Sequence, residues 1–145
     1  MRILYIVFLL FQLPQSNWYL NFADAQLESV KTHKMMLINF SGSDWCGPCI
    51  REKKEIFGSS VFEAYAAAHL ILVSADFPRQ KQHELSPEQT KRNEALADIY
   101  NPDGKFPYTL LINEKGRTLM AWDGIPEGGT EIFIKQISDL ENGLR

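Results

Sequence analysis

Cysteine and histidine are scarce in this sequence. The chain of 145 residues has two cysteines, Cys46 and Cys49, and three histidines that stand singly. Two cysteines three residues apart cannot build a structural disulfide framework, because such bridges stabilise by closing longer loops. A zinc site would need two further ligands at tetrahedral reach, and the isolated histidines form no second ligand pair. We therefore expect neither a metal site nor a cofactor.

A strong charge imbalance and a long apolar run are also missing. The formal net charge is −3, which gives no electrostatic reason to expect nucleic acid or an acidic membrane as a partner. The apolar run at residues 3–11 is too short to span a bilayer. Without an internal repeat, a low-complexity tract or a linker, the length indicates one domain with a sizeable core.

The two cysteines belong to the pentapeptide Trp-Cys-Gly-Pro-Cys at residues 45–49. Residues 35–40 form an apolar run of strand length that ends in a turn-prone Ser-Gly-Ser-Asp stretch. Residues 50–57 favour a helix, and Pro48 is tolerated in its first turn. The pattern places the first thiol at a helix N-terminus, where unpaired amide groups favour the thiolate.

This pentapeptide resembles the active site of the thioredoxin superfamily. The longer stretch from Phe40 to Cys46 is similar to secreted bacterial thioredoxin-like proteins, including the C-terminal domain of the thiol:disulfide interchange protein. The similarity runs from about Trp18 to Leu140. It implies an α/β thioredoxin-like fold, in which a central mixed sheet carries helices on both faces.

Periodicity and turn residues predict the individual elements. We expect strands at residues 18–22, 35–40, 69–75, 108–113 and 118–122. We expect helices at 24–33, 50–57, 60–68 and 86–100 and a last helix from residue 130. Four of these helices begin with a residue that can act as N-cap, namely Asp24, Ser60, Ser86 and Thr130. The residues expected to face inward are Leu27, Val30, Ala95, Leu96, Ile99, Phe133, Ile137 and Leu140.

Residues 1–16 are typical of a signal peptide, with Arg2 as the positive start and residues 3–11 as the apolar core. The stretch Ala-Asp-Ala at 23–25 fits the small-x-small cleavage rule better than Ser16 does. Cleavage there would remove residues that the resemblance assigns to the domain, so we favour cleavage near Ser16 and a domain at 17–145. An uncleaved anchor or a first buried strand is the alternative. Export predicts a periplasmic or secreted protein in an oxidising space.

The candidate catalytic residues are Cys46 and Cys49. A thiolate at Cys46 would attack a disulfide, and Cys49, one helical turn away, would then resolve the mixed disulfide. Gly47 lets a substrate backbone approach and Pro48 stiffens the pair. The resemblance implies that Trp45 shields the attacking sulfur, although a simple packing role is equally compatible with the sequence.

The resemblance adds a second substrate-binding element at Phe106-Pro107. In the superfamily a cis-proline before the fourth strand faces the disulfide, and the residue before it offers backbone hydrogen bonds to substrate. Here Tyr108 separates Pro107 from Thr109, which leaves the register of the following strand open.

One position departs from the superfamily pattern. Thioredoxins carry a buried aspartate on the central strand with a lysine on the next strand, and here Asn39 and Leu72 occupy those places. An asparagine cannot accept the proton that Cys49 must lose. Water or Asp44 could take that proton, but we expect Asp44 to be an exposed carboxylate without a role. The polar loop at 79–85 is expected to be a solvated excursion rather than a docking patch.

The sequence as a whole favours an exported, monomeric thiol-disulfide oxidoreductase that reduces protein disulfides. Gly-Pro between the cysteines resembles reductases, whereas strong oxidants typically carry Pro-His. The expected partners are disulfide-bearing protein substrates and a membrane or soluble thiol electron donor. Two alternatives remain at this level: a redox-inactive binding module of thioredoxin fold for a client protein, and a metal carrier that uses the dithiol.

Overall fold

Five strands form one mixed sheet in the order β1-β3-β2-β4-β5. The strands are β1 (Trp18–Tyr19), β2 (Met35–Ser41), β3 (Leu70–Asp76), β4 (Tyr108–Ile112) and β5 (Thr118–Asp123). β1 and β2 run parallel to β3, whereas β4 runs antiparallel to both β2 and β5. The computed structural model describes residues 17–144, so the predicted signal peptide at 1–16 lies outside the described residues. The mixed sheet predicted for the fold is confirmed.

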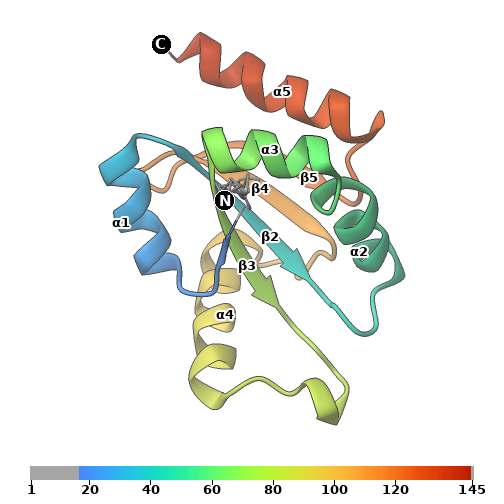
Figure 1. The fold of residues 1–145 in the computed structure, drawn as a ribbon. Coiled ribbons are helices and arrows are strands. Elements are labelled where there is room, and N and C mark those ends of the chain that lie inside the picture. The colour runs from blue at the N-terminus through green and yellow to red at the C-terminus, as the bar shows by residue number, and fades with distance from the viewer. Residues whose placement is uncertain (1–16, 145) are drawn as a thin grey trace, which may run out of the picture.

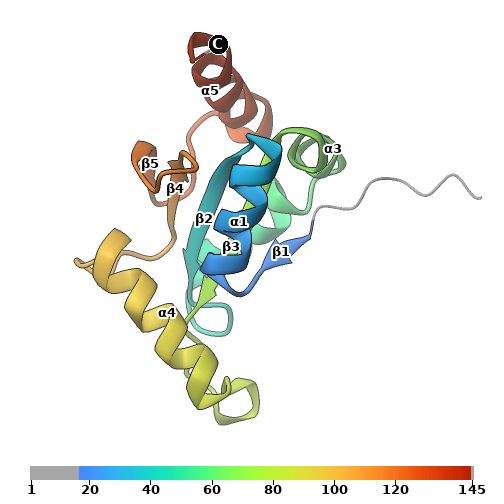
Figure 2. The same cartoon turned by 90° about the vertical axis from the view of Figure 1, so that its left-hand side faces the viewer.

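Helices cover both faces of the sheet (Figures 1 and 2). They are α1 (Phe22–Thr32), α2 (Gly47–Glu52), η1 (Lys53–Phe57), α3 (Ser60–His69), η2 (Lys81–His83), α4 (Pro87–Tyr100) and α5 (Gly129–Gly143). α1 and α4 pack on one face through Ala25 and Leu96. η1, α3 and α5 pack on the other face through residues such as Phe62 and Phe133. Figure 2 shows α3 and α4 on opposite sides of the central strands.

The two central strands are buried nearly throughout, as expected when both sheet faces carry helices. Their carboxyl ends lie at the same end of the sheet, and from there the chain leads to α2 and to α4 (Figure 1). This end therefore brings the cysteine segment together with the loop that follows β3. Among residues 17–144 no helix is long and apolar enough to cross a membrane.

The first helix differs from its prediction. α1 starts at Phe22, and Asn21 rather than Asp24 is its cap, accepting the N–H of Ala23 at 3.0 Å. The first strand is correspondingly shorter than residues 18–22. Leu27 and Val30 were predicted to face inward, but they are 71% and 51% exposed. The small residues Ala25 and Ser29 face the sheet instead, because short side chains allow the helix to lie close to it.

Helix α4 has the predicted extent, and Ser86 accepts the N–H of Gln89 at 3.2 Å. Leu96 is buried as predicted, but Ala95 and Ile99 are exposed. The helix is rotated so that Asn93 points inward, where its side-chain amide donates to the carbonyl of Asp76 at 2.8 Å. A polar contact with the end of β3 therefore selects the buried face.

Two helix caps also lie near, but not at, the predicted residues. Ser59 rather than Ser60 caps α3, accepting the N–H of Phe62 at 3.2 Å. Gly128, with φ of 84°, precedes α5, and Thr130 lies inside that helix and donates to the carbonyl of Glu55 at 3.1 Å. Phe133 and Ile137 are buried as predicted, and Leu140 packs against the same core cluster.

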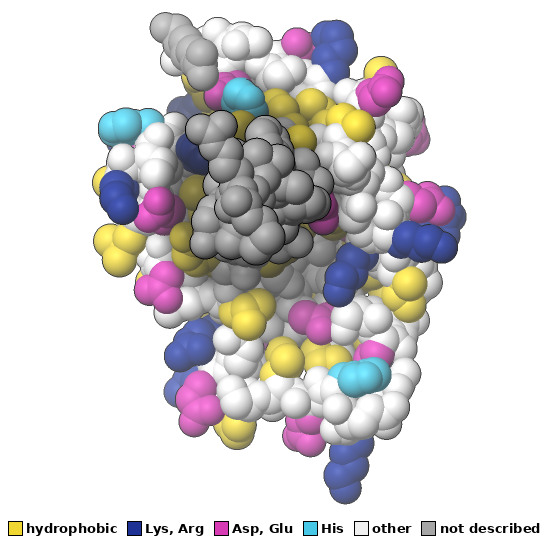
Figure 3. Space-filling model, viewed as in Figure 1, with side chains coloured by type: hydrophobic (Ala, Val, Ile, Leu, Met, Phe, Trp, Pro, Cys, Tyr) yellow, Lys and Arg dark blue, Asp and Glu magenta, His cyan; other side chains and the backbone are white. Residues whose placement is uncertain are grey.

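On the face shown in Figure 3, acidic and basic side chains are interspersed rather than gathered into one patch. This surface agrees with the small net charge of −3. It offers no broad field of one sign to attract a polyelectrolyte.

Candidate active site

Cys46 occupies the N-cap of α2 and is joined to Cys49 by a disulfide, with 5.2 Å between the Cα atoms. The backbone of Cys46 is extended, and its Sγ accepts the N–H of Cys49 at 3.2 Å. The N–H of Gly42 points at the Sγ of Cys49 at 3.5 Å. The predicted placement of the first sulfur at the start of a helix is confirmed. An ionised sulfur here would receive an N–H bond and the favourable field of the helix end.

The cysteine pair is more enclosed than the sequence suggested. Cys46 is 5% exposed and Cys49 is 2% exposed, whereas a sulfur that attacks a protein disulfide has to be reached from solvent. Gly47 and Pro48, which lie between them in sequence, are exposed. Both cysteines are therefore buried, and the exposed surface next to them in the chain is Gly47-Pro48.

The peptide bond between Phe106 and Pro107 is cis, as the resemblance implied. It directly precedes β4, and the pairing of β4 with β2 places Thr109 opposite Asn39. This pairing settles the register that Tyr108 left open. The Phe106 ring packs edge-on against the rings of Trp45 and Phe77, at centroid distances of 5.5 and 5.4 Å. The ring contact between Phe106 and Trp45 therefore joins the cis-proline segment to the cysteine segment.

Trp45 is held rigidly beside the disulfide. Its Nε1–H donates to the carbonyl of Phe77 at 2.7 Å. A Cβ atom added to Gly42 would overlap the indole ring, so glycine is required there for the ring to lie flat against the backbone. The guanidinium of Arg79 covers the indole at 3.6 Å from the ring centroid. The ring is thus a fixed wall of the site.

A buried carboxylate that the sequence analysis did not identify lies on the helix that carries Cys49. Glu52 is 1% exposed and is located in α2, three residues after Cys49. Its Oε2 accepts the Asn39 side-chain amide at 2.9 Å, and its Oε1 accepts the Thr109 hydroxyl at 3.3 Å. The amide of Asn39 also donates to Thr109 Oγ1 at 3.0 Å. Glu52 therefore supplies the acid that Asn39 lacks, from a different element.

Burial raises the pKa of Glu52 to about 7, while the hydrogen bonds from Asn39 and Thr109 oppose the rise. Leu72 is 1% exposed in the neighbouring strand, so this position supplies no cation to hold the carboxylate ionised. A cavity of about 320 Å³ adjoins the cluster, and Asn39 lines it together with Ser41 and Ser74. One signal in the sequence could have identified Glu52. Residues three apart on a helix share a face, so a helix that turns Cys49 inward also turns Glu52 inward.

Residues 22–138 match the family model of the thioredoxin-like domain. The chain belongs to the thioredoxin-like domain family. Disulfide bond reductase DsbH of Chlamydia pneumoniae is 36% identical over 121 residues, which cover 83% of this chain and 71% of that protein. The solved structure of a DsbH oxidoreductase superposes with a TM-score of 0.78 at 30% identity, covering 86% of this chain and 83% of the other.

The oxidised C-terminal domain of Neisseria meningitidis DsbD shares the fold at a TM-score of 0.54 and 16% identity, covering 81% of this chain and 90% of that domain. These comparisons confirm the family and the α/β thioredoxin-like fold. This thioredoxin-like protein is thus a homologue of a disulfide bond reductase and carries a paired Cys-x-x-Cys.

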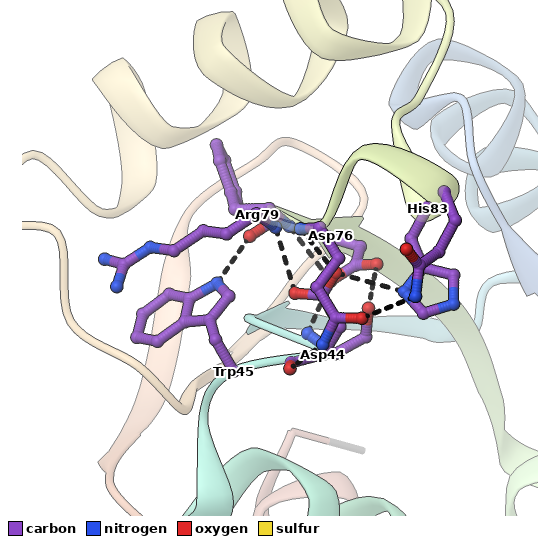
Figure 4. A network of polar contacts seen from close by, with 9 residues as sticks. Asp44, Trp45, Asp76, Arg79 and His83 are labelled. Carbon is purple, nitrogen blue, oxygen red and sulfur yellow. Dashed lines mark hydrogen bonds and ion pairs between the residues drawn. The ribbon is translucent and has the colours of Figure 1, made fainter.

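Asp44 differs from its prediction. Its side chain is 4% exposed, and its carboxylate accepts the N–H groups of Arg79 at 2.9 Å and Gln80 at 2.8 Å (Figure 4). His83 Nδ1 lies 3.1 Å from the same carboxylate. Desolvation would raise the pKa of Asp44, but these hydrogen bonds and the His83 contact outweigh it and lower the pKa below its ordinary value. Asp44 thus fastens the loop after β3 to the cysteine segment.

The structure brings together most of the predicted site residues. Contacts link the 45–49 segment, Phe106 and the loop after β3 into one surface. Among residues 17–144 no group of three or more His, Cys, Asp or Glu side chains is arranged to hold a metal ion.

Proposed function

We propose that this thioredoxin-like protein is an exported thiol-disulfide oxidoreductase that reduces disulfides in protein substrates through Cys46 and Cys49. The observation that carries the proposal is the position of Cys46 Sγ at a helix N-terminus, where it accepts the N–H of Cys49. A relative that is 36% identical is a disulfide bond reductase. In the dithiol form this position favours a thiolate, which is the nucleophile in disulfide exchange.

The chemistry proceeds in two exchanges. The Cys46 thiolate attacks one sulfur of the substrate disulfide, the substrate S–S bond breaks, and one substrate thiolate leaves. The Cys49 thiolate then attacks Cys46 Sγ, which releases the second substrate thiolate and forms the Cys46–Cys49 disulfide. The substrate gains two electrons and the protein loses two. A membrane or soluble dithiol donor must return these electrons.

We assign Glu52 as the group that accepts the proton of the Cys49 thiol. Cys49 must lose its proton before it can attack the mixed disulfide, and Asn39 cannot accept it. Glu52 is buried on the same short helix, and burial raises its pKa to about 7, so that it can both take and release a proton near neutral pH. Asn39 and Thr109 hold its carboxylate in place. The cavity lined by Asn39 offers the proton a route to solvent.

The substrate chain is assigned to the surface made by Trp45, Gly47, Pro48, Phe106 and Pro107. Gly47 and Pro48 are exposed beside the disulfide, and the cis bond presents the Phe106 backbone on the neighbouring segment. The apolar segment within residues 1–16 supports export to the periplasm or beyond, with cleavage near Ser16. We propose that the protein acts as a monomer.

The cysteines act in different steps, so they can be tested separately. Cys46→Ser should abolish reduction of a protein disulfide, whereas Cys49→Ser should accumulate mixed disulfides through Cys46. Expression of Cys49→Ser in the native host, followed by non-reducing electrophoresis and mass spectrometry, identifies the trapped partners. If both cysteines can be replaced without loss of the biological function, the protein is a binding module rather than an enzyme.

The direction of electron flow is tested by the reduction potential. We expect a value near that of thioredoxin, about −270 mV, rather than near that of a strong periplasmic oxidant at about −120 mV. Equilibration with glutathione buffers and quantification of the two redox forms give the value. A potential close to the second figure would contradict the assignment as a reductase.

A further inference from the structure

An exposed cation lies over the side chain that precedes Cys46. The guanidinium carbon of Arg79 is 3.6 Å from the centre of the Trp45 ring, and Arg79 itself is exposed. Figure 4 shows the guanidinium pointing away from Asp44 and along the indole. Stacking uses the flat face of the guanidinium, so its N–H donors remain available at the edge.

Both the cation and its platform are fixed in advance. Asp44 accepts the backbone N–H groups of Arg79 and Gln80, and the Gln80 side chain donates to the Asp44 carbonyl at 2.9 Å. The Trp45 indole is held by the Phe77 carbonyl at 2.7 Å. Fixing a loop before binding removes part of the ordering cost that a ligand would otherwise have to offset.

The charge of Arg79 is not neutralised within the part of the chain that the structure describes. The carboxylate of Asp44 accepts backbone N–H groups and lies beside His83, and it forms no ion pair with Arg79. On the Phe106 side of the surface, Lys105 is paired with Asp123 at 3.0 Å. The acids Glu84 and Glu94 line the hollow behind the loop, but no ion pair joins either of them to Arg79 among residues 17–144. Among residues 17–144, Arg79 is therefore a cation that lies over Trp45 and forms no ion pair with an acid.

We propose that Arg79 determines substrate specificity by binding a carboxylate close to the substrate disulfide. The inference rests on the proposed function and narrows its substrate class to protein disulfides flanked by Asp or Glu. A guanidinium matches a carboxylate with two parallel N–H···O bonds. Because Trp45 directly precedes Cys46, a carboxylate bound at its edge holds the neighbouring disulfide beside the nucleophile.

The test uses three peptides, each with one disulfide and identical except for Asp, Asn or Lys next to one cysteine. kcat/KM for their reduction is measured for the wild-type protein, Arg79→Gln and Lys81→Gln. Lys81 is the matched control, because it is an exposed cation on the same loop and two residues away. Wild type and Lys81→Gln should favour the Asp peptide over the Asn peptide by up to about fivefold, in the order Asp, Asn, Lys. In Arg79→Gln the ratio should fall below about twofold.

Added salt should weaken the wild-type preference, because the carboxylate binds at an exposed site. Equal kcat/KM for the Asp and Asn peptides in the wild type would overturn the inference, and so would a preference that survives Arg79→Gln. These failures leave the proposed function standing, since all peptides are still reduced. Failure of the wild type to reduce any of the three would contradict the proposed function itself.

Discussion

At the scale of single residues, Glu52 is the least expected feature of the molecule. A carboxylate that is 1% exposed and has hydrogen bonds but no cation partner among residues 17–144 is costly to ionise. The two hydrogen bonds do not offset the lost solvation, and the pKa therefore rises to about 7. Titratable groups with strongly shifted pKa values gather at functional sites, and this one lies three residues from Cys49 on α2.

The shifted pKa of Glu52 predicts a pH-dependent stability. The pKa is about 7 in the folded protein against an ordinary value of 4.5, so between these values the folded state binds more protons than the unfolded state. Stability from this group is therefore full below pH 4.5 and falls by about 3 kcal/mol as the pH rises through 7. Urea unfolding of oxidised wild type and Glu52→Gln should show the variant gaining this amount relative to wild type at pH 8, and little at pH 4.

The same variant should slow the second exchange. Glu52→Gln cannot take the proton of Cys49, so the mixed disulfide should persist and the reduction rate should lose its dependence on a group with a pKa of about 7. The matched control is Glu55→Gln, since the Glu55 side chain is exposed and forms a solvent-facing ion pair with Arg51. Parallel pH profiles for wild type and Glu52→Gln would contradict the proton-acceptor role.

At the scale of elements, two carboxylates join the turns that follow β2 and β3. Asp44 accepts the backbone N–H groups of Arg79 and Gln80. In the reverse direction, Asp76 at the end of β3 accepts the backbone N–H of Ser43 at 2.9 Å. The loop after β3 is exposed at residues 79–84, as expected of a solvated excursion, but these bonds anchor its first residues beside the cysteine segment. The η2 turn within this loop is exposed, whereas Arg79 and Gln80 at the start of the loop are anchored by Asp44.

Asp44→Asn should release this loop. Asp44 uses one oxygen for each N–H group, and an amide replaces one of these oxygens with an NH2 donor. The amides of Arg79 and Gln80 should therefore lose protection from hydrogen exchange by about tenfold, a typical effect for one charge-assisted bond. In wild type the lowered pKa of Asp44 keeps the carboxylate ionised even at pH values somewhat below the ordinary pKa of an aspartate. The anchoring is therefore lost only as the pH falls through the lower, folded-state pKa.

Hydrogen exchange followed by mass spectrometry measures this protection. Asp98→Asn on the exposed face of α4 serves as the control. Unchanged protection of Arg79 and Gln80 in Asp44→Asn would show that the loop is held by other contacts.

At the scale of the whole molecule, two separate cores lie on the two faces of the sheet. The core beneath α3 and α5 contains a group of contacting rings, in which Phe133 contacts Phe62 and Trp122 at ring distances of 6.0 and 4.7 Å. The opposite core, beneath α1 and α4, includes Ala25 and Leu96. The site sits at the sheet end between these two layers, so its geometry depends on both.

Core and surface apolar residues should differ sharply in their effect on stability. Phe133→Ala removes a fully buried ring and should lower the free energy of unfolding by about 3–5 kcal/mol. Leu27→Ala, at a position 71% exposed, should change it by less than about 0.5 kcal/mol. Urea denaturation of both variants decides the matter. A loss at Leu27→Ala comparable to that at Phe133→Ala would restore the inward-facing prediction for α1.

Local signals in the sequence determined much of this fold. Apolar runs bounded by turn residues located β2 to β5, and Ser86-Pro87 marked the start of α4. The Cys-Gly-Pro-Cys stretch placed Cys46 at a helix start, and the resemblance implied the cis bond before Pro107. These features depend on residues close together in the chain, because backbone propensity and hydrophobic periodicity act over a few residues.

Only the tertiary structure decided which side of each helix is buried and which charged residues lie at the site. Ala25 rather than Leu27 meets the sheet, since helix packing selects by fit as well as by hydrophobicity. Glu52 is buried by Asn39 and Thr109, and Asp44 is buried by the amides of a loop some 35 residues away. In the sequence both acids look like solvent-facing residues, because Glu52 stands in a charged stretch and Asp44 in a polar turn. Their roles come from contacts between distant segments, which only the packed chain brings together.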